Sequence, residues 1–180
     1  LVLAMDTHIH ADHVTAIGPL CKYIEGCQSA MGVHSKAEHL DIHLKEGETL
    51  NVDGIKFTNL YTPGHTDDSY SYLMNDRVFT GDTLLIRGTG RTDFQNGNPE
   101  QQYDSLFNKL LTLPDNILVY PAHDYKGQTV STIGEERRCN PRLQVSNMQE
   151  YVDMMNQLKL SDPKKMDIAI PANLKCGLRD

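Results

Sequence analysis

The chain has 180 residues, of which 39% are hydrophobic and 23% charged. No apolar run approaches the roughly 20 residues that a membrane-spanning helix needs, so we expect a soluble globular protein that forms one domain over residues 1–180. The 17 Lys and Arg against 24 Asp and Glu give a net charge of −7. This balance argues against nucleic acid or an anionic membrane surface as a partner, and an anionic ligand would have to meet local basic residues.

The first half of the chain shows strand and helix patterns in alternation. An apolar run at residues 1–5 predicts a buried strand that delivers polar residues from its carboxyl end. Apolar residues at helical spacing follow at 14–23, and the alternation over 50–60 around Asp53-Gly54 predicts a hairpin. Two further strands are expected at 70–74 and 77–79, joined by a turn at Asn75-Asp76.

The second half continues this alternation. Residues 100–113 have the pattern of an amphipathic helix, residues 117–120 that of a strand, and residues 147–158 that of a helix capped by Ser146 or Asn147. Residues 166–170 look like a strand. Several strands end in Asp or His with helices between them, which predicts an α/β fold with polar side chains along one edge of its sheets.

Cysteine usage indicates a reducing compartment. Four cysteines are too few and too irregularly spaced for a disulfide framework, and no CxxC pair is present. We expect reduced thiols, with Cys176 as a buried structural thiol. No secretory signal opens the sequence, so an intracellular protein is expected. Because the chain begins with Leu1 and a dense polar motif follows within a few residues, the start of a longer chain is expected to be missing.

Histidines and aspartates concentrate at predicted strand ends. Residues 7–13, Thr-His-Ile-His-Ala-Asp-His, contain three histidines and one aspartate. Burying clustered imidazoles is costly unless a metal ion compensates them, so the cluster predicts a metal site. Three more ligand candidates follow other strands: His65, Asp82 and His123. The glycines before His65 and Asp82 permit the tight turns that would aim these side chains at one point.

The motifs THxHADH, PGHT, TGD and PAHDY, in this order, resemble the metallo-β-lactamase superfamily. That resemblance implies an αββα sandwich with metal bound at the edge between two sheets. More narrowly, GTGRTDFQ (88–95), YPAHDYKG (120–127), NPR (140–142) and PANLKCG (171–177) resemble the persulfide dioxygenases of the ETHE1 type. Members of that family carry about two strands and a helix before THxHADH, so N-terminal strands are expected to be missing from this chain.

The resemblance leaves two metal arrangements open. In the hydrolases of the superfamily, His8, His10 and His65 would hold one Zn²⁺ and Asp12, His13 and His123 a second, with Asp82 bridging. In the dioxygenases, one Fe²⁺ would be held by three residues: His8, His65 and Asp82. The remaining four residues, His10, Asp12, His13 and His123, would then support the ligands and bound water from outside the coordination shell.

The dioxygenase resemblance implies oxidation of glutathione persulfide by O₂ to sulfite and glutathione, within sulfide oxidation. The alternative is a glyoxalase II-like dinuclear hydrolase of glutathione thioesters, although the segment after His123 is short for the helical domain of that enzyme. The resemblance also favours a homodimer, in the cytoplasm or in the mitochondrial matrix.

Several side chains are candidates for substrate binding or catalysis. Arg91 is expected to bind a carboxylate of glutathione, the alternative being a side chain that is exposed or paired with Asp93. Tyr125 is expected to contact the substrate and to act in catalysis, together with Asp12 and His123. Lys126 and Arg142 are weaker candidates for such a contact and are expected to be solvated. Three further histidines are expected on the surface: His34, His39 and His43.

Overall fold

The computed structural model describes residues 1–178, and most of its strands belong to two sheets. The smaller sheet contains three parallel strands: β1 (Leu3–Met5), β2 (Gln28–Gly32) and β3 (Ile42–Leu44). The larger sheet has the order β11 (Ser131–Thr132), β10 (Leu118–Pro121), β7 (Arg77–Gly81), β6 (Tyr70–Leu73), β5 (Ile55–Tyr61) and β4 (Thr49–Val52). Its strands are antiparallel except for β10 and β7, and a separate short pair is formed by β8 (Leu84–Leu85) and β9 (Gly88–Thr89).

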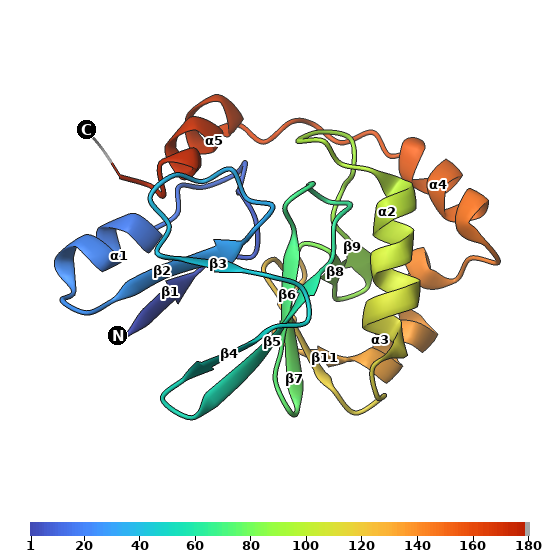
Figure 1. Ribbon diagram of the computed structural model, residues 1–180. Coiled ribbons are helices and arrows are strands. Elements are labelled where there is room, and N and C mark those ends of the chain that lie inside the picture. Colours follow the sequence, from blue (N-terminus) through green and yellow to red (C-terminus); the bar gives the residue numbers. More distant parts are fainter. Residues whose placement is uncertain (179–180) are drawn as a thin grey trace.

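Helices cover the outer faces of both sheets (Figure 1). The smaller sheet is covered by α1 (Ile17–Tyr23) and α5 (Met166–Leu174). The larger sheet is covered by α2 (Pro99–Asp104), α3 (Ile133–Cys139) and α4 (Met148–Asn156). The layers therefore run helix, sheet, sheet, helix, which confirms the predicted αββα sandwich.

Three apolar clusters separate these four layers. The cluster between the sheets is built on Tyr70 and Tyr72 of β6 with Ala30 and Leu44 of the smaller sheet. A second cluster lies between the smaller sheet and its helices, and a third, the most extensive, lies between the larger sheet and α2, α3 and α4. Strands covered on both faces are buried along their length, as in β6 with its pattern of three successive buried residues, whereas β4 keeps the alternation of a strand with one exposed face.

Most predicted elements are present near their expected positions. The hairpin β4–β5 turns at Asp53 and Gly54, which have φ of +50° and +87°, the left-handed pair that a two-residue hairpin requires. The Oδ1 atom of Asn147 accepts a hydrogen bond from the backbone N–H of Glu150 at 3.0 Å, so Asn147 caps α4 as expected.

Two expectations need correction. Residues 166–170 are not a strand, because they form the first half of α5, which buries Ala169 and Asn173 on one face and leaves Ile168 exposed. Met166, Ile168 and Ile170 occur at every second position, which is the spacing typical of a strand. The helix expected over residues 100–113 changes form along its length, since α2 continues as a π-helical turn η1 (Ser105–Lys109) and a 3₁₀ turn η2 (Leu110–Thr112).

Candidate metal centre and its cavity

Four ligand-bearing loops meet at one edge of the two sheets. His8 follows β1, His65 follows β5, Asp82 follows β7 and His123 follows β10. The smaller sheet supplies only the first of these loops. The site therefore lies between the two sheets, at the position that the motifs predicted.

Glycines allow these loops to approach closely. Gly64 has a φ of +136°, and a Cβ there would lie 2.3 Å from the Cα of Gln102. Gly81 has a φ of +52°, and a Cβ there would lie 2.6 Å from Oγ1 of Thr7. Neither position accommodates a side chain, which confirms the reason for glycine before His65 and Asp82.

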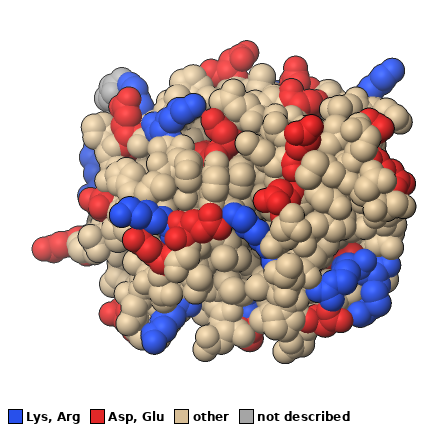
Figure 2. Space-filling model, turned by 45° about the vertical axis from the view of Figure 1, so that its right-hand side comes forward, with Lys and Arg blue, Asp and Glu red and all other residues tan. Residues whose placement is uncertain are grey.

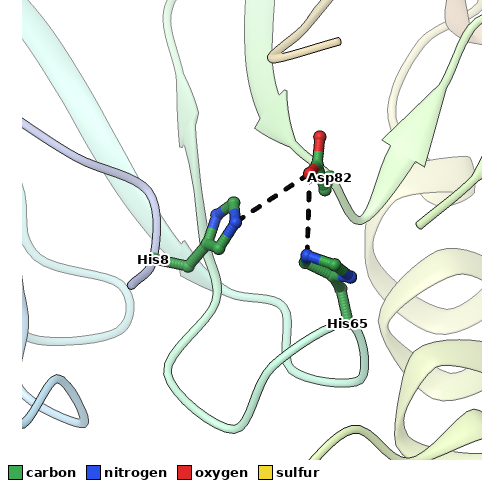
Figure 3. Close-up of side chains that lie close together, drawn as sticks. All are labelled: His8, His65 and Asp82. Carbon is green, nitrogen blue, oxygen red and sulfur yellow. Dashed lines mark ion pairs between the residues drawn. The ribbon is translucent and has the colours of Figure 1, made fainter. Parts of the chain in front are cut away.

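His8, His65 and Asp82 point toward one another (Figure 3). The Nε2 atom of His8 lies 3.9 Å and that of His65 3.6 Å from Oδ2 of Asp82. All three ligand atoms lie within 4.8 Å of one another. Both imidazoles are buried, with exposed fractions of 2% for His8 and 6% for His65.

Hydrogen bonds orient both imidazoles, and that of His65 leaves its Nε2 free for a metal ion. Nδ1 of His65 lies 2.8 Å from the carbonyl oxygen of Arg91, which can only accept, so Nδ1 carries the proton and Nε2 the lone pair. Nδ1 of His8 lies 2.9 Å from the hydroxyl oxygen of Thr7, which can donate or accept, so this contact orients the ring. Burial, reinforced by the neighbouring histidines, holds the pKa of His8 well below its usual value. Two buried, oriented imidazoles with one carboxylate fit a divalent metal ion.

A second group of ligand atoms lies beside the first. His10, Asp12 and His13 also place three ligand atoms within 4.8 Å, but Asp12 and His13 are exposed. His10 is buried, and no described residue hydrogen-bonds its Nδ1. This second group also has the composition of a metal site, so both arrangements that the sequence left open retain their ligands.

His123 connects the two groups. Its Nδ1 lies 2.7 Å from Oδ1 of Asp82 and its Nε2 lies 3.0 Å from Oδ2 of Asp12. The hydrogen bond to Asp82, followed by the charges of Asp82 and Asp12, raises the pKa of His123 to about 9. All seven ligand candidates named from the sequence therefore form one continuous polar cluster.

A cavity of about 680 Å³ opens beside the cluster and contains His65, Asp82 and His123 in its wall. Tyr125 stands at its edge, 83% exposed, with its ring parallel to that of His123 at 6.0 Å between centroids. No hydrogen bond to the Tyr125 hydroxyl is present among residues 1–178. This hydroxyl is therefore available to a molecule in the cavity.

Arg91 also lines the cavity, but its guanidinium already has partners. It donates to both carboxylate oxygens of Asp93, at 2.5 and 2.6 Å, and to the carbonyl oxygen of Ser161 at 2.7 Å. Contact of Arg91 with a substrate stays a prediction, and it would require the substrate to compete with Asp93.

Arg142 differs from the expectation of a solvated side chain. It is half-buried in the cavity wall, because the turn η3 (Pro141–Leu143) directs it inward. Lys126 is exposed as expected, and so are the three histidines assigned to the surface: His34, His39 and His43.

Sequence reasoning missed three side chains that hold the ligand loops. The Nδ2 atom of Asn173 donates to the carbonyl oxygens of His10 and His13, each at 2.8 Å. The Nε2 atom of Gln95 donates to the carbonyl oxygen of Ile9 at 2.8 Å, and the buried carboxylate of Asp68 accepts from the N–H of Ile9 at 3.0 Å. The sequence offered one signal for these residues: Gln95 and Asn173 lie in motifs 88–95 and 171–177, and Asp68 lies near PGHT. Hydrogen bonds to a distant loop produce no periodic pattern in the sequence.

Charged side chains do not form a single patch on the face shown in Figure 2, where acidic and basic groups are interspersed over a mostly uncharged surface. All four cysteines are free thiols, and burial raises the pKa of the Cys176 thiol to about 11. Among the described residues, no helix has the length and apolar character needed to cross a membrane.

Comparisons with known proteins give concordant matches. The model of the metallo-beta-lactamase superfamily matches residues 22–123. The mouse protein named persulfide dioxygenase ETHE1, mitochondrial, is 46% identical over 99% of this chain and 70% of its own length. A crystal structure of ETHE1 from Myxococcus xanthus is 50% identical, with a TM-score of 0.95 over 98% of this chain and 78% of that one. A hydroxyacylglutathione hydrolase of Dictyostelium discoideum is 39% identical over 66% of this chain and 46% of its own length.

Proposed function

Because the chain belongs to the ETHE1 persulfide dioxygenases of the metallo-beta-lactamase superfamily, we propose that it oxidises glutathione persulfide at one Fe²⁺ ion. The observation that carries the proposal is the 46% identity to a persulfide dioxygenase over 99% of this chain. That identity makes the protein a sulfur dioxygenase, as the motifs predicted. The carrier thiol and the identity and number of metal ions belong to the proposal.

His8, His65 and Asp82 would hold the iron. Two imidazoles and one carboxylate on one face leave other coordination positions open, and bound Fe²⁺ would supply these positions for sulfur and O₂ together with its redox chemistry. The net reaction of glutathione persulfide with O₂ and H₂O gives glutathione, sulfite and two protons. The protein must therefore position two reactants and receive protons.

The chain's own residues suit these tasks. His123, between Asp82 and Asp12, would hold Asp82 in place and pass protons through its Nε2 to the exposed carboxylate of Asp12. The free hydroxyl of Tyr125 would donate a hydrogen bond to the substrate sulfur or to an oxygen joined to it. Arg91 remains a proposed contact to a substrate carboxylate.

The group His10, Asp12 and His13 supports the hydrolase alternative, in which a second metal ion would prepare a hydroxide for attack on a thioester. The hydrogen bonds of His123 to both Asp82 and Asp12 and the exposure of Asp12 and His13 favour supporting roles for these residues. The length of matched chain also favours the dioxygenases, since the hydrolase relative covers 66% of this chain.

Compartment and assembly are further proposals. We place the protein inside the cell, in the cytoplasm or the mitochondrial matrix, a choice supported by the free thiols and by the mitochondrial names of the mammalian relatives. The homodimer rests on family resemblance.

Oxygen uptake tests the proposal. Protein mixed with glutathione persulfide in an oxygen electrode should consume O₂ and form sulfite in step, and anaerobic mixtures should show no turnover. Elemental analysis should find close to one iron per chain. Two zinc ions per chain, with rapid hydrolysis of lactoylglutathione and no O₂ uptake, would replace the dioxygenase by the hydrolase.

A further inference from the structure

Two thiols face each other where α1 passes into β2. Cys21 lies in the last turn of α1, and Cys27 comes directly before β2. The thiol of Cys21 donates to Sγ of Cys27 over a distance of 3.5 Å. The other two cysteines have different surroundings, since the thiol of Cys176 donates to the carbonyl oxygen of Glu38 at 3.0 Å and Cys139 is exposed at the end of α3. Cys21 and Cys27 are therefore the two cysteines placed to react with each other.

The backbone holds the two thiols in this position. The N–H of Ile24 donates to the carbonyl oxygen of Leu20 at 2.9 Å and ends α1, and the N–H of Cys27 donates to the carbonyl oxygen of Ile24 at 3.1 Å. Gly26, with a φ of +79°, allows the chain to turn between them. A disulfide has an S–S length of about 2 Å, so the two sulfur atoms need to approach by about 1.5 Å, which small side-chain rotations supply.

The two thiols differ in their access to solvent. Cys21 is partly exposed, whereas Cys27 is 8% exposed and packs in the cluster between the smaller sheet and its helices. A reagent in solution therefore reaches Cys21 first. Burial, followed by the hydrogen bond with Cys27, raises the pKa of Cys21 to about 11. Because the thiolate is the reactive form, the pair exchanges slowly at neutral pH.

We propose that Cys21 and Cys27 form a reversible disulfide that clamps α1 to β2, with glutathione disulfide as the oxidant. The thiolate of Cys21 attacks one sulfur of glutathione disulfide, which forms a mixed disulfide and releases one glutathione thiolate. Cys27 then loses its proton, attacks Sγ of Cys21 and releases the second glutathione. Two protein thiols are oxidised, one small disulfide is reduced, and two glutathione molecules form. This inference is independent of the proposed function.

The position of the pair in the chain favours a reversible cross-link. Cys21 and Cys27 are six positions apart, so their disulfide closes a short loop and restricts the unfolded chain only modestly. In a reducing compartment, disulfides are usually transient and respond to the redox state. The clamp still joins a helix to a strand of the smaller sheet, so it should raise the melting temperature by roughly 5 °C.

Peptide mass mapping of the full chain tests the inference. Reduced protein should be incubated with glutathione disulfide at about pH 8.5, which increases the thiolate fraction, and its remaining thiols then alkylated. We expect a peptide that joins Cys21 to Cys27, and its loss when excess reduced glutathione is added. Cys21 and Cys27 that stay free in the wild type, or that carry separate glutathione adducts, would overturn the inference without any variant being needed.

Three variants sharpen this test. Cys27→Ser should stop at one glutathione on Cys21, and Cys21→Ser should leave the buried Cys27 free. The matched control Cys139→Ser removes the exposed thiol and should form the cross-link as the wild type does. A cross-link that involves Cys176 or Cys139 instead would overturn the assignment.

The melting temperature tests the clamp. Oxidation should raise it in the wild type and in Cys139→Ser but not in Cys27→Ser. Equal melting temperatures for the oxidised and reduced wild type would overturn the clamp. Neither measurement uses enzymatic activity, so a failure here is distinguishable from a failure of the proposed function.

Discussion

The groups His8/His65/Asp82 and His10/Asp12/His13 have equally compact ligand atoms but differ in how they are built. The first takes one residue from each of three loops, and both of its imidazoles are buried. The second comes from one loop, and two of its three members are exposed. Each histidine of the first group has a hydrogen bond that orients its ring, whereas Nδ1 of His10 has none from the described residues. Proximity alone therefore does not distinguish a prepared metal site, while burial and fixed orientation do.

The largest effect is expected from removing the shared carboxylate of the first group. Asp82→Ala should abolish iron binding, because both imidazoles would face the ion without a charge to balance it. His13→Ala should retain close to one iron per chain, because His13 belongs to the exposed group. Elemental analysis of the two purified variants measures the contrast, and loss of iron from both would make the two groups one site.

A smaller but still severe effect is expected from Gly90→Ala. A Cβ at Gly90 would lie 2.1 Å from the carbonyl oxygen of Asp82 and 2.9 Å from the ring of His65. Such overpacking costs about 1–3 kcal/mol and would displace two of the three ligands. Iron affinity should fall, as measured by competition with a chelator.

Gly88→Ala provides the control for that substitution. A Cβ at Gly88 meets only Cβ of Leu85, at 4.0 Å, so iron affinity should be preserved. Equal affinities in Gly88→Ala and Gly90→Ala would show that the first group tolerates displacement and is not a rigid site.

Asn173→Ala tests what holds the second group. Its side chain bonds the carbonyl oxygens of His10 and His13 and the N–H of Thr15, and it is 2% exposed. Leaving these groups without a partner should lower the free energy of unfolding by about 1–3 kcal/mol, measured with urea. Iron content should stay near one per chain, since Asn173 makes no bond to His8, His65 or Asp82. A concurrent loss of iron would mean that the second group supports the first directly.

The smallest effect is expected from Asp68, which contacts both the loop that carries His8 and the loop that carries His65. Its carboxylate accepts from the N–H of Ile9 and the hydroxyl of Thr66, yet burial raises its pKa above 3.8. In the pH range between 3.8 and the raised pKa, the folded protein keeps a proton that the unfolded chain has lost. This group's contribution to the stability therefore falls as pH rises through that range. The stability of Asp68→Asn relative to the wild type should rise over the same range, and an unchanged difference in urea unfolding would contradict the assignment.

Local sequence patterns predicted secondary structure well where a feature depends on adjacent residues alone. The hairpin at Asp53-Gly54 and the cap at Asn147 depend on a few adjacent residues, so their sequence signals survive folding. Residues 166–170 look like a strand in isolation because α5 is anchored through Asn173, whose side-chain partners lie more than 150 residues away in the chain. The burial of Arg142 was missed for the same reason, since the turn η3 is not visible in periodicity, whereas substrate contact by Arg91, which pairs with Asp93, stays a prediction.

The sequence by itself determined the chemistry: which side chains can bind metal, that they follow strands, and which family carries these motifs. The tertiary structure decided which ligands are buried and oriented, that Arg91 is neutralised by Asp93, and that Arg142 is half-buried in the cavity wall. Ligand type and local conformation are properties of neighbouring residues. Burial and charge pairing arise only when distant segments meet. The orientation and the charge state of the site residues therefore depend on tertiary contacts, which a linear sequence pattern does not contain.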